Sequence, residues 1–256
     1  MIACVTAAAA GSSGQPEPAA PGAVSPATTQ AGTVSPVLFP HPLITEVLYA
    51  VPGGDKGDAD GDGVRSATGD EFIELVNPHD KPIELQGYVI TDAEPVPKPG
   101  EPAPNKDSDN RLRFVFPKLT LQPGEVVVVF NGFESKAKGP IGDSRAAAKA
   151  VNPAFHGAWV FSMKAESKYA ALGNSGDCVQ VLSSDGTAIQ CVKWAEIEEK
   201  MPKETAAVVD IAPESKGSVQ RSSATEPFVA HRTLAGPHAG ELFSPGRFGE
   251  KRIEKP

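Results

Sequence analysis

The chain has 256 residues, enough for one large domain or one medium domain with tails, and its 25 glycines and 25 prolines favour many turns and short strands over long helices. The formal net charge is -8 and Lys and Arg form no basic stripe, which argues against binding to nucleic-acid phosphates. No apolar run approaches the ~20 residues that a membrane-spanning helix needs.

The first 36 residues show no pattern of core positions. They are rich in Ala, Pro, Ser, Thr and Gly and carry almost no charge, which predicts a disordered tether over residues 1–36. The start, MIAC, lacks the basic region and the longer apolar region of a signal peptide. A small residue before Cys4, followed by a low-complexity tether, is typical of the end of a bacterial lipoprotein signal. This pattern makes Cys4 a candidate lipidation site in an exported protein that is periplasmic, anchored in the outer membrane or extracellular. The alternative is a short or cleaved leader in which Cys4 has no role.

From Leu43 onward, short apolar runs alternate with turn signals, which is the pattern of an all-β sandwich. Gly87 marks a bulge or bend in the third run, and the most apolar run, EVVVVFN, is expected near the centre of its sheet. The predicted strands cover residues 43–50, 71–77, 83–92, 111–117, 125–131, 158–162 and 218–223. One helix is expected, over residues 142–151, because the segment is rich in alanine and Asp143 or Ser144 can cap it.

A hairpin is predicted over residues 177–194, with Asp185-Gly186 in its turn. A four-residue turn would place Cys178 directly opposite Cys191, whereas a two-residue turn would make them diagonal neighbours on one face. The pair is either two small buried thiols or, in an exported protein, a cross-strand disulfide. The chain has no CxxC pair and no Cys/His cluster, which argues against a structural zinc site.

Six segments, taken in order, resemble the lamin-tail domain family in its bacterial secreted form: ITEVLY, DEFIELVNP, IELQGYVITD, LQPGEVVVVFNG, LGNSGDCVQVLSSDGT and SPGRFG. The resemblance implies an immunoglobulin-like β-sandwich over residues 37–249, with insertions near 93–110, 133–155 and 195–216 and a tail at 250–256. It also implies a mostly non-catalytic module of exported, often cell-surface proteins, which would present a face or an edge strand to a protein or glycan partner.

The segment DADGDGVRSATGDEFIEL, residues 58–75, begins with the pattern of a calcium-binding EF-hand loop. Asp58, Asp60 and Asp62 alternate, Gly63 allows a sharp turn, and Val64 would offer its carbonyl oxygen. However, position 12 of the loop is glycine rather than glutamate, and no amphipathic helix flanks the loop on either side. The stretch DEFIEL that follows is typical of a strand, so an EF-hand is excluded.

A calcium ion can still be held on a β-scaffold if Asp70 or Glu71 reaches back from the start of this strand. The alternative is a solvated acidic turn, because Asp and Gly are ordinary turn residues. Four aspartates within eight residues repel one another, and a cation would relieve that repulsion. The predicted structural calcium ligands are Asp58, Asp60, Asp62, Val64, Asp70 and Glu71.

The segment GNSGD, residues 173–177, resembles the nucleophile loop of serine proteases only superficially, since catalysis also needs a His base and an Asp around Ser175. The five histidines lie in loops and show no metal-ligand spacing. Three functions remain. The first is a non-catalytic exported binding or structural module with a calcium-stabilised loop. The second is a metal-dependent hydrolase, or an accessory to one, that uses the acidic loop. The third is an intracellular scaffold related to the nuclear members of the family.

Overall fold

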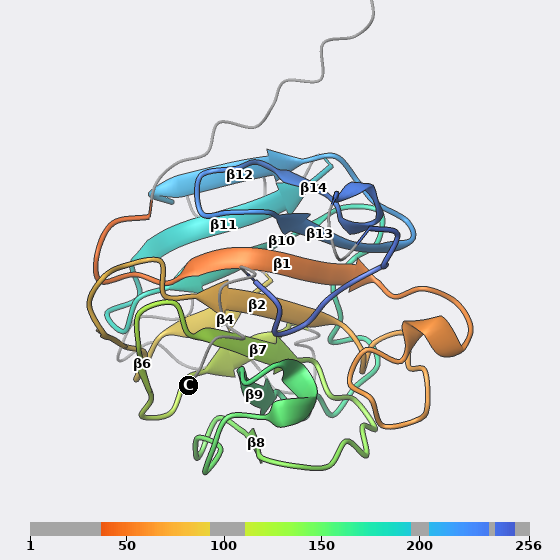
Figure 1. The fold of residues 1–256 in the computed structure, drawn as a ribbon, viewed down its shortest axis with the longest axis horizontal. Helices are drawn as coiled ribbons and strands as arrows, with labels where there is room; N and C mark the ends of the chain where they lie inside the picture. The colour runs from red at the N-terminus through yellow and green to blue at the C-terminus, as the bar shows by residue number, and fades with distance from the viewer. Residues whose placement is uncertain (1–36, 93–110, 196–204, 236–238, 249–256) are drawn as a thin grey trace, which may run out of the picture. The chain divides into compact units, whose positions relative to one another are not determined.

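The computed structural model describes residues 37–92, 111–195, 205–235 and 239–248. Within these ranges, strands are joined by turns and by single turns of 3₁₀-helix. A seven-stranded and a five-stranded sheet pack face to face as an immunoglobulin-like β-sandwich, which confirms the predicted fold class (Figure 1). The predicted tether with Cys4, the predicted insertion near 93–110 and the predicted tail at 250–256 lie outside the described residues.

The larger sheet has the strand order β14-β13-β1-β2-β7-β9-β8. Its neighbours are antiparallel except that β9 runs parallel to both β7 and β8. β2 and β7 are buried along their whole length, as expected for apolar strands that are covered on both faces. The strand bounds are β1 Leu43–Ala50, β2 Phe72–Val76, β7 Val126–Phe130, β8 Ile141–Gly142, β9 Trp159–Ser162, β13 Gly217–Arg221 and β14 Phe228–Ala230.

The smaller sheet has the order β12-β11-β10-β4-β5, and β3 pairs with β6 in a separate two-stranded sheet. β10 and β11 form the predicted hairpin, and β12 continues the sheet by running parallel to β11. The bounds are β3 Ile83–Glu84, β4 Val89–Thr91, β5 Arg113–Val115, β6 Thr120–Leu121, β10 Asp177–Leu182, β11 Ala188–Trp194 and β12 Ala207–Ile211.

The core between the two sheets is built from alternate residues of each strand. Ile73 and Leu75 of β2 and Val179 and Val181 of β10 belong to this cluster. Tyr49 of β1 and Trp194 of β11 stack in parallel, with ring centroids 4.0 Å apart and planes 9° apart. Because β1 and β11 belong to different sheets, this stack links the two layers.

A second apolar cluster lies on the outer face of the larger sheet. It contains Phe72 of β2, Val128 of β7 and Val160 of β9. The 3₁₀-turn η2 (Pro153–Phe155) covers part of this face with Phe155, and Phe243 from the last described segment packs edge-to-face on Phe72. The larger sheet is therefore apolar on both sides, which explains the unbroken VVVV run of β7.

The prediction of a helix over residues 142–151 is wrong. Ile141 and Gly142 form β8, and the alanine-rich residues after them form bends with no helical turn. Asp143 does accept hydrogen bonds from the backbone N–H groups of Arg145 and Ala146, as a cap would, but no helix follows it. A ten-residue helix without an apolar stripe gains too little from packing to outweigh strand pairing with β9.

Two smaller predictions need correction. The strand expected over 83–92 is divided into β3 and β4 by a turn in which Gly87 has a positive φ of 83°. The segment 218–223 is last in the series of predicted strands, but β14 follows it. β7 is an interior strand beside β2, which agrees with the position near the centre of the sheet that the most apolar run predicts. β12 lies within the predicted insertion near 195–216.

Trp194 should be the most sensitive single core position. Its ring is fully buried, stacks on Tyr49, and donates a hydrogen bond from Nε1 to the carbonyl oxygen of Gly173 at 2.8 Å. We expect Trp194→Ala to lower the free energy of unfolding by about 3–5 kcal/mol. We expect Trp194→Phe to cost clearly less, because it keeps an aromatic ring in the stack. Urea denaturation of the two variants measures both values, and equal losses would contradict a dominant role for the stack.

Candidate metal site

The acidic loop joins β1 to β2 at one end of the sandwich. It begins with the short turn η1 (Asp55–Gly57) and is tied back to the end of β1 by Arg65. The Arg65 side chain donates from Nε to the carbonyl oxygen of Pro52 and from Nη2 to that of Val51, both at 2.9 Å. These two hydrogen bonds hold the ends of the loop together without a ligand.

Asp70 organises the loop from the start of β2. Its Oδ1 accepts the backbone N–H groups of Ala59 at 2.6 Å and Asp60 at 2.9 Å, and its Oδ2 accepts that of Ser66 at 2.5 Å. The residue is 1% exposed. Burial raises the pKa of this carboxyl, and the three backbone N–H groups oppose that rise. The Asp70 side chain thus fixes the backbone conformation of the eight residues 59–66.

Three of the predicted ligands converge. Asp58, Asp60 and Asp70 each offer a carboxylate oxygen, and these atoms lie within 4.8 Å of one another. Oxygen ligands of one calcium ion sit about 2.3–2.6 Å from it, so atoms on opposite sides of the ion lie about 5 Å apart. The spacing of the three oxygens fits a shared calcium ion.

The carboxyls of the cluster repel one another. Burial, followed by the smaller effect of the neighbouring carboxyls of Asp70 and Asp62, raises the pKa of Asp60 to about 6. Hydrogen bonds from Ser135 and from the backbone N–H of Asp62 work in the opposite direction. A bound cation would stabilise the ionised form of all three carboxyls.

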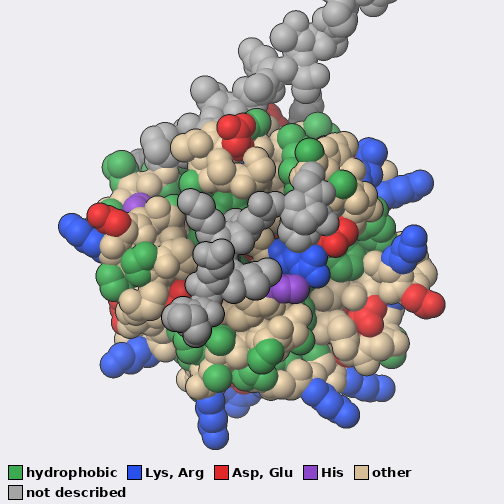
Figure 2. Space-filling view, in the orientation of Figure 1, with side chains coloured by type: hydrophobic (Ala, Val, Ile, Leu, Met, Phe, Trp, Pro, Cys, Tyr) green, Lys and Arg blue, Asp and Glu red, His purple; other side chains and the backbone are tan. Residues whose placement is uncertain are grey.

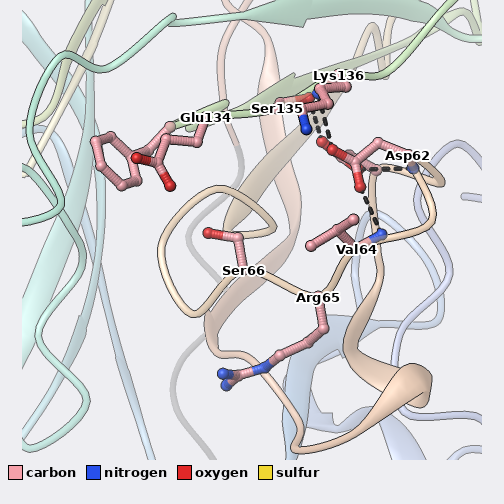
Figure 3. A pocket seen from close by; sticks show the side chains of 9 residues that line it. Asp62, Val64, Arg65, Ser66, Glu134, Ser135 and Lys136 are labelled. Carbon is pink, nitrogen blue, oxygen red and sulfur yellow. Dashed lines mark hydrogen bonds between the residues drawn. The ribbon is translucent and has the colours of Figure 1, made fainter.

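The other predicted ligands are placed differently. Asp62 uses its carboxylate to accept the backbone N–H groups of Val64 at 2.7 Å and Lys136 at 2.8 Å, so it ties the loop to the segment after β7 (Figure 3). The Val64 side chain is exposed. Glu71 lies in the interior, where its Oε2 accepts the backbone N–H of Leu172 at 3.0 Å. Burial, with smaller contributions from Asp177 and Asp92, raises the pKa of Glu71 to about 9.

A cavity of about 460 Å³ adjoins the cluster (Figure 3). Asp60, Asp62, Ser135 and Lys136 are among its lining residues, and the Ser135 hydroxyl donates to the Asp60 carboxylate. The Glu134 and Asp62 side chains lie on opposite sides of the view in Figure 3. The cavity provides room for water or a small ligand beside the three aspartates.

Cys178 and Cys191 are free, buried thiols that form a small cluster of their own. The hairpin register pairs Cys178 with Lys193 and Gln180 with Cys191, so the two cysteines are diagonal neighbours on one face. This arrangement is the second of the two that the sequence allowed. It arises because the register shifts between Val181 and Leu182, near the turn.

Ser175 lies in a turn closed by the Asp177 carboxylate, which accepts the backbone N–H of Gly173 at 2.7 Å. Of the histidines, His41, His79, His156 and His231 are described and His238 is not. Among the described residues, the aspartate cluster is the group of acidic, His or Cys side chains spaced for a metal ion.

The sequence analysis missed a buried polar cluster on the outer face of the larger sheet. Its centre is Glu46 of β1 and Glu74 of β2, both with no exposed surface. The sequence carries one sign of this cluster: a glutamate lies inside each of two strongly apolar segments, LITEVLYA and EFIELVN. A charged residue in such a position is almost never fully buried without partners.

Residues 40–196 match the family model of the Lamin Tail Domain. The match covers more than half of the chain, and the chain belongs to the lamin tail domain family. The family supports an immunoglobulin-like structural or binding module. A search of curated protein sequences found no significant match.

The hydrogen bonds of Asp70 predict a structural role that does not depend on a metal. Asp70→Ala leaves the backbone N–H groups of Ala59, Asp60 and Ser66 without their acceptor, so we expect it to lower the free energy of unfolding by about 3 kcal/mol in the presence of a chelator. Asp70→Asn keeps one carbonyl oxygen and should lose less. Denaturant unfolding measures both, with Asp80→Ala, at an exposed position, as the matched control. A chelator-treated Asp70→Ala protein as stable as the control would contradict this role.

Proposed function

We propose that this lamin tail domain is a non-catalytic binding or structural module of an exported or cell-surface protein, and that a calcium ion stabilises its β1–β2 loop. The observation that carries the calcium proposal is the convergence of Asp58, Asp60 and Asp70 on one point. The family supports the module, since its members are immunoglobulin-like domains that are generally non-catalytic.

Calcium suits this set of ligands better than softer metals. All three side chains offer carboxylate oxygen, which hard cations such as calcium prefer, and no described Cys or His side chain joins the cluster. The loop backbone is already held by Asp70 and Arg65, so little ordering is needed when an ion binds. Water in the adjoining cavity can complete the coordination.

The surface supports a protein or glycan partner more than a nucleic acid. Figure 2 shows Lys and Arg side chains mostly around the rim of the visible face, with Asp and Glu among them. The net charge of -8 opposes binding to phosphates. β12 is an edge strand of its sheet, and its Val208 is 39% exposed. An edge strand can pair with an extended segment of a partner protein.

Export and a lipid anchor at Cys4 belong to the same proposal, although Cys4 lies outside the described residues. The composition of residues 1–36 supports them. In the described part of the chain, every helical segment is too short to span a membrane. Replacing Cys4 by Ala should abolish incorporation of radiolabelled palmitate if the anchor exists.

One observation favours the alternative, a metal-dependent hydrolase or its accessory. The hydroxyl of Ser135 contacts the Asp60 carboxylate at the edge of the cavity of about 460 Å³. Hydrolysis also requires a base that activates water or a nucleophile, and none of the described histidines joins the metal cluster. Hydrolysis of ester or phosphoester substrates that is lost in Asp60→Asn would support the enzyme over the binding module.

Calcium should raise the melting temperature. At a calcium concentration 100 times its Kd, binding contributes about 2.7 kcal/mol, which corresponds to a rise of about 5–10 °C for a domain of this size. Asp60→Asn keeps an acceptor for the Asp62 N–H, and its amide NH2 can donate to the Ser135 hydroxyl, but it removes the charge, so the rise should disappear. Asp60→Ala should remove it too. Differential scanning calorimetry with chelator and with millimolar calcium tests this, and Asp80→Ala should respond like the wild type. Identical melting curves in the two conditions would refute a calcium site.

We also propose that Cys178 and Cys191 form a disulfide in the oxidising environment that export implies. Their contact as diagonal neighbours favours it. Protein isolated from the exported fraction should then show no titratable thiol from this pair after unfolding without reductant, and two after reduction. Cys178→Ser should leave one reactive thiol at Cys191 in both conditions. Two free thiols in the unreduced exported protein would refute the bond.

A further inference from the structure

The edge of the larger sheet holds a buried arginine. Arg221 is the last residue of β13, which pairs with β14, the edge strand among the described strands of this sheet (Figure 1). Val219 of the same strand belongs to the core between the sheets, and Arg221, two residues later, faces the same side. The Arg221 side chain has no exposed surface. An arginine is almost never buried to this extent without a partner for its charge.

One nitrogen and the face of the Arg221 guanidinium are engaged. Nη1 donates to the carbonyl oxygen of Ala224 at 3.2 Å, in the turn between β13 and β14, residues 222–227. The guanidinium carbon lies 4.4 Å from the ring centroid of Phe228, which is directly opposite Arg221 in the antiparallel pair. This distance is that of a cation–π contact. The two contacts hold the guanidinium in place over β14.

The other two nitrogens of Arg221 have no acceptor. Nε and Nη2 are both buried, and neither has a hydrogen-bond partner among the described residues. These two nitrogens lie along one edge of the planar guanidinium, and their N–H groups form the parallel pair that binds both oxygens of a carboxylate. We call this pair of donors the Arg221 fork. Burial lowers the pKa of Arg221 to about 10, so the guanidinium still carries its charge at neutral pH.

The fork needs a partner that meets two separate requirements. A buried charge is costly unless it is paired, and two buried donors without acceptors add to that cost. A water molecule can accept hydrogen bonds from the donors but cannot neutralise the charge. A doubly charged phosphate would leave one negative charge in excess. A carboxylate has one charge and two oxygens in the plane of the fork, so it meets both requirements.

We propose that the Arg221 fork binds a carboxylate group, which belongs to a free small organic acid or to an acidic residue of a partner protein. The group enters through the β13–β14 turn, in which Ser222, Thr225 and Glu226 are exposed. The backbone hydrogen bond that closes this turn, from Glu226 to Ser223, is 3.3 Å long. A small movement of this short surface turn uncovers the fork.

This site goes beyond the proposed calcium-stabilised module. It adds a class of ligand, and none of the proposed calcium ligands contributes to it. The two proposals therefore fail separately. A protein that does not respond to calcium can still bind a carboxylate at Arg221, and the experiments below are performed in the presence of a chelator.

Nuclear magnetic resonance of the Arg221 Nε–H group observes the fork directly. Sodium formate, the smallest carboxylate, should shift this resonance downfield in a saturable way and slow the exchange of its proton with water. Its three non-hydrogen atoms limit the dissociation constant to about 1 mM or weaker. Sodium chloride at the same ionic strength should not reproduce the shift. No shift at about 100 mM formate, or an equal shift with chloride, would overturn the proposal.

A peptide separates the two sources of the carboxylate. The blocked tripeptide acetyl-Gly-Glu-Gly-amide carries its carboxylate only on the side chain, and acetyl-Gly-Gln-Gly-amide is its neutral control. If the Glu peptide shifts the Arg221 resonance as formate does and the Gln peptide does not, the fork accepts an acidic residue of a partner. If formate alone shifts it, the fork accepts a free small acid. Equal shifts with the two peptides would contradict recognition of the carboxylate.

Variants test whether the two-donor edge is required. At ten times its dissociation constant, formate should raise the wild-type melting temperature by about 3–6 °C relative to chloride. Arg221→Lys keeps a positive charge but loses the fork, so the rise should disappear. Arg221→Met should also show no rise. Arg145→Lys, at an exposed position, should respond like the wild type. An undiminished rise in Arg221→Lys would overturn the proposal.

The remaining alternative is a partner within the same turn. Glu226 is exposed and close in sequence, so its carboxylate could occupy the fork after a movement of the turn. In that case formate would shift the Arg221 resonance in Glu226→Gln but not in the wild type, and this result would overturn the proposal of an external ligand. Equal formate responses in the wild type and Glu226→Gln support it. If the Arg221 variants fail to fold, these two proteins still decide.

Discussion

The larger sheet is buried on both faces, so η2 and residues 239–248, which we call the strap, cover its outer face. Each polar group on that face then needs a partner inside the protein. β7 tolerates this because all its side chains are apolar. β1, β2 and β13 do not, because they carry Glu46, Glu74 and Gln220 toward the same side. The position of the strap therefore depends on the need to satisfy these buried groups as much as on its apolar contacts.

The same solution recurs at three places in the described chain where a segment without regular structure meets the sandwich. A buried carboxyl accepts backbone N–H groups from the segment and fixes its path. Asp70 does this for the β1–β2 loop, Glu71 for the segment at Leu172, and Glu46 for the strap. Each carboxyl replaces the strand pairing that a loop lacks, but its burial raises its pKa. An acidic protein with proline-rich and glycine-rich loops thus gains order from groups that are sensitive to protons and cations.

The strands and the hairpin could be predicted because alternation and turn residues are local signals. The helix over 142–151 could not be excluded locally, since its alanine content favours a helix and only pairing with β9 opposes it. Of the predicted ligands Asp70 and Glu71, only Asp70 lies beside Asp58 and Asp60. The two residues are adjacent at the start of a strand, where successive side chains point to opposite sides, so only one of them can face the loop. The hydrogen bond from the Ser244 backbone N–H to Glu46 joins residues 198 positions apart, and no local pattern reveals it.

The aspartates of the loop and the Glu46–Glu74 pair differ in their exposure to solvent. This exposure decides whether an ion from solvent can neutralise their charge. The aspartates of the loop adjoin a cavity, and Asp58 is partly exposed, so an ion can reach them from solvent and neutralise several carboxylates at once. Glu46 and Glu74 have no exposed surface, and the backbone N–H groups of Ser244 and Gly246 donate hydrogen bonds to them. A cation in solvent can therefore reach the loop aspartates directly, whereas the buried glutamates are stabilised by hydrogen bonds from within the protein.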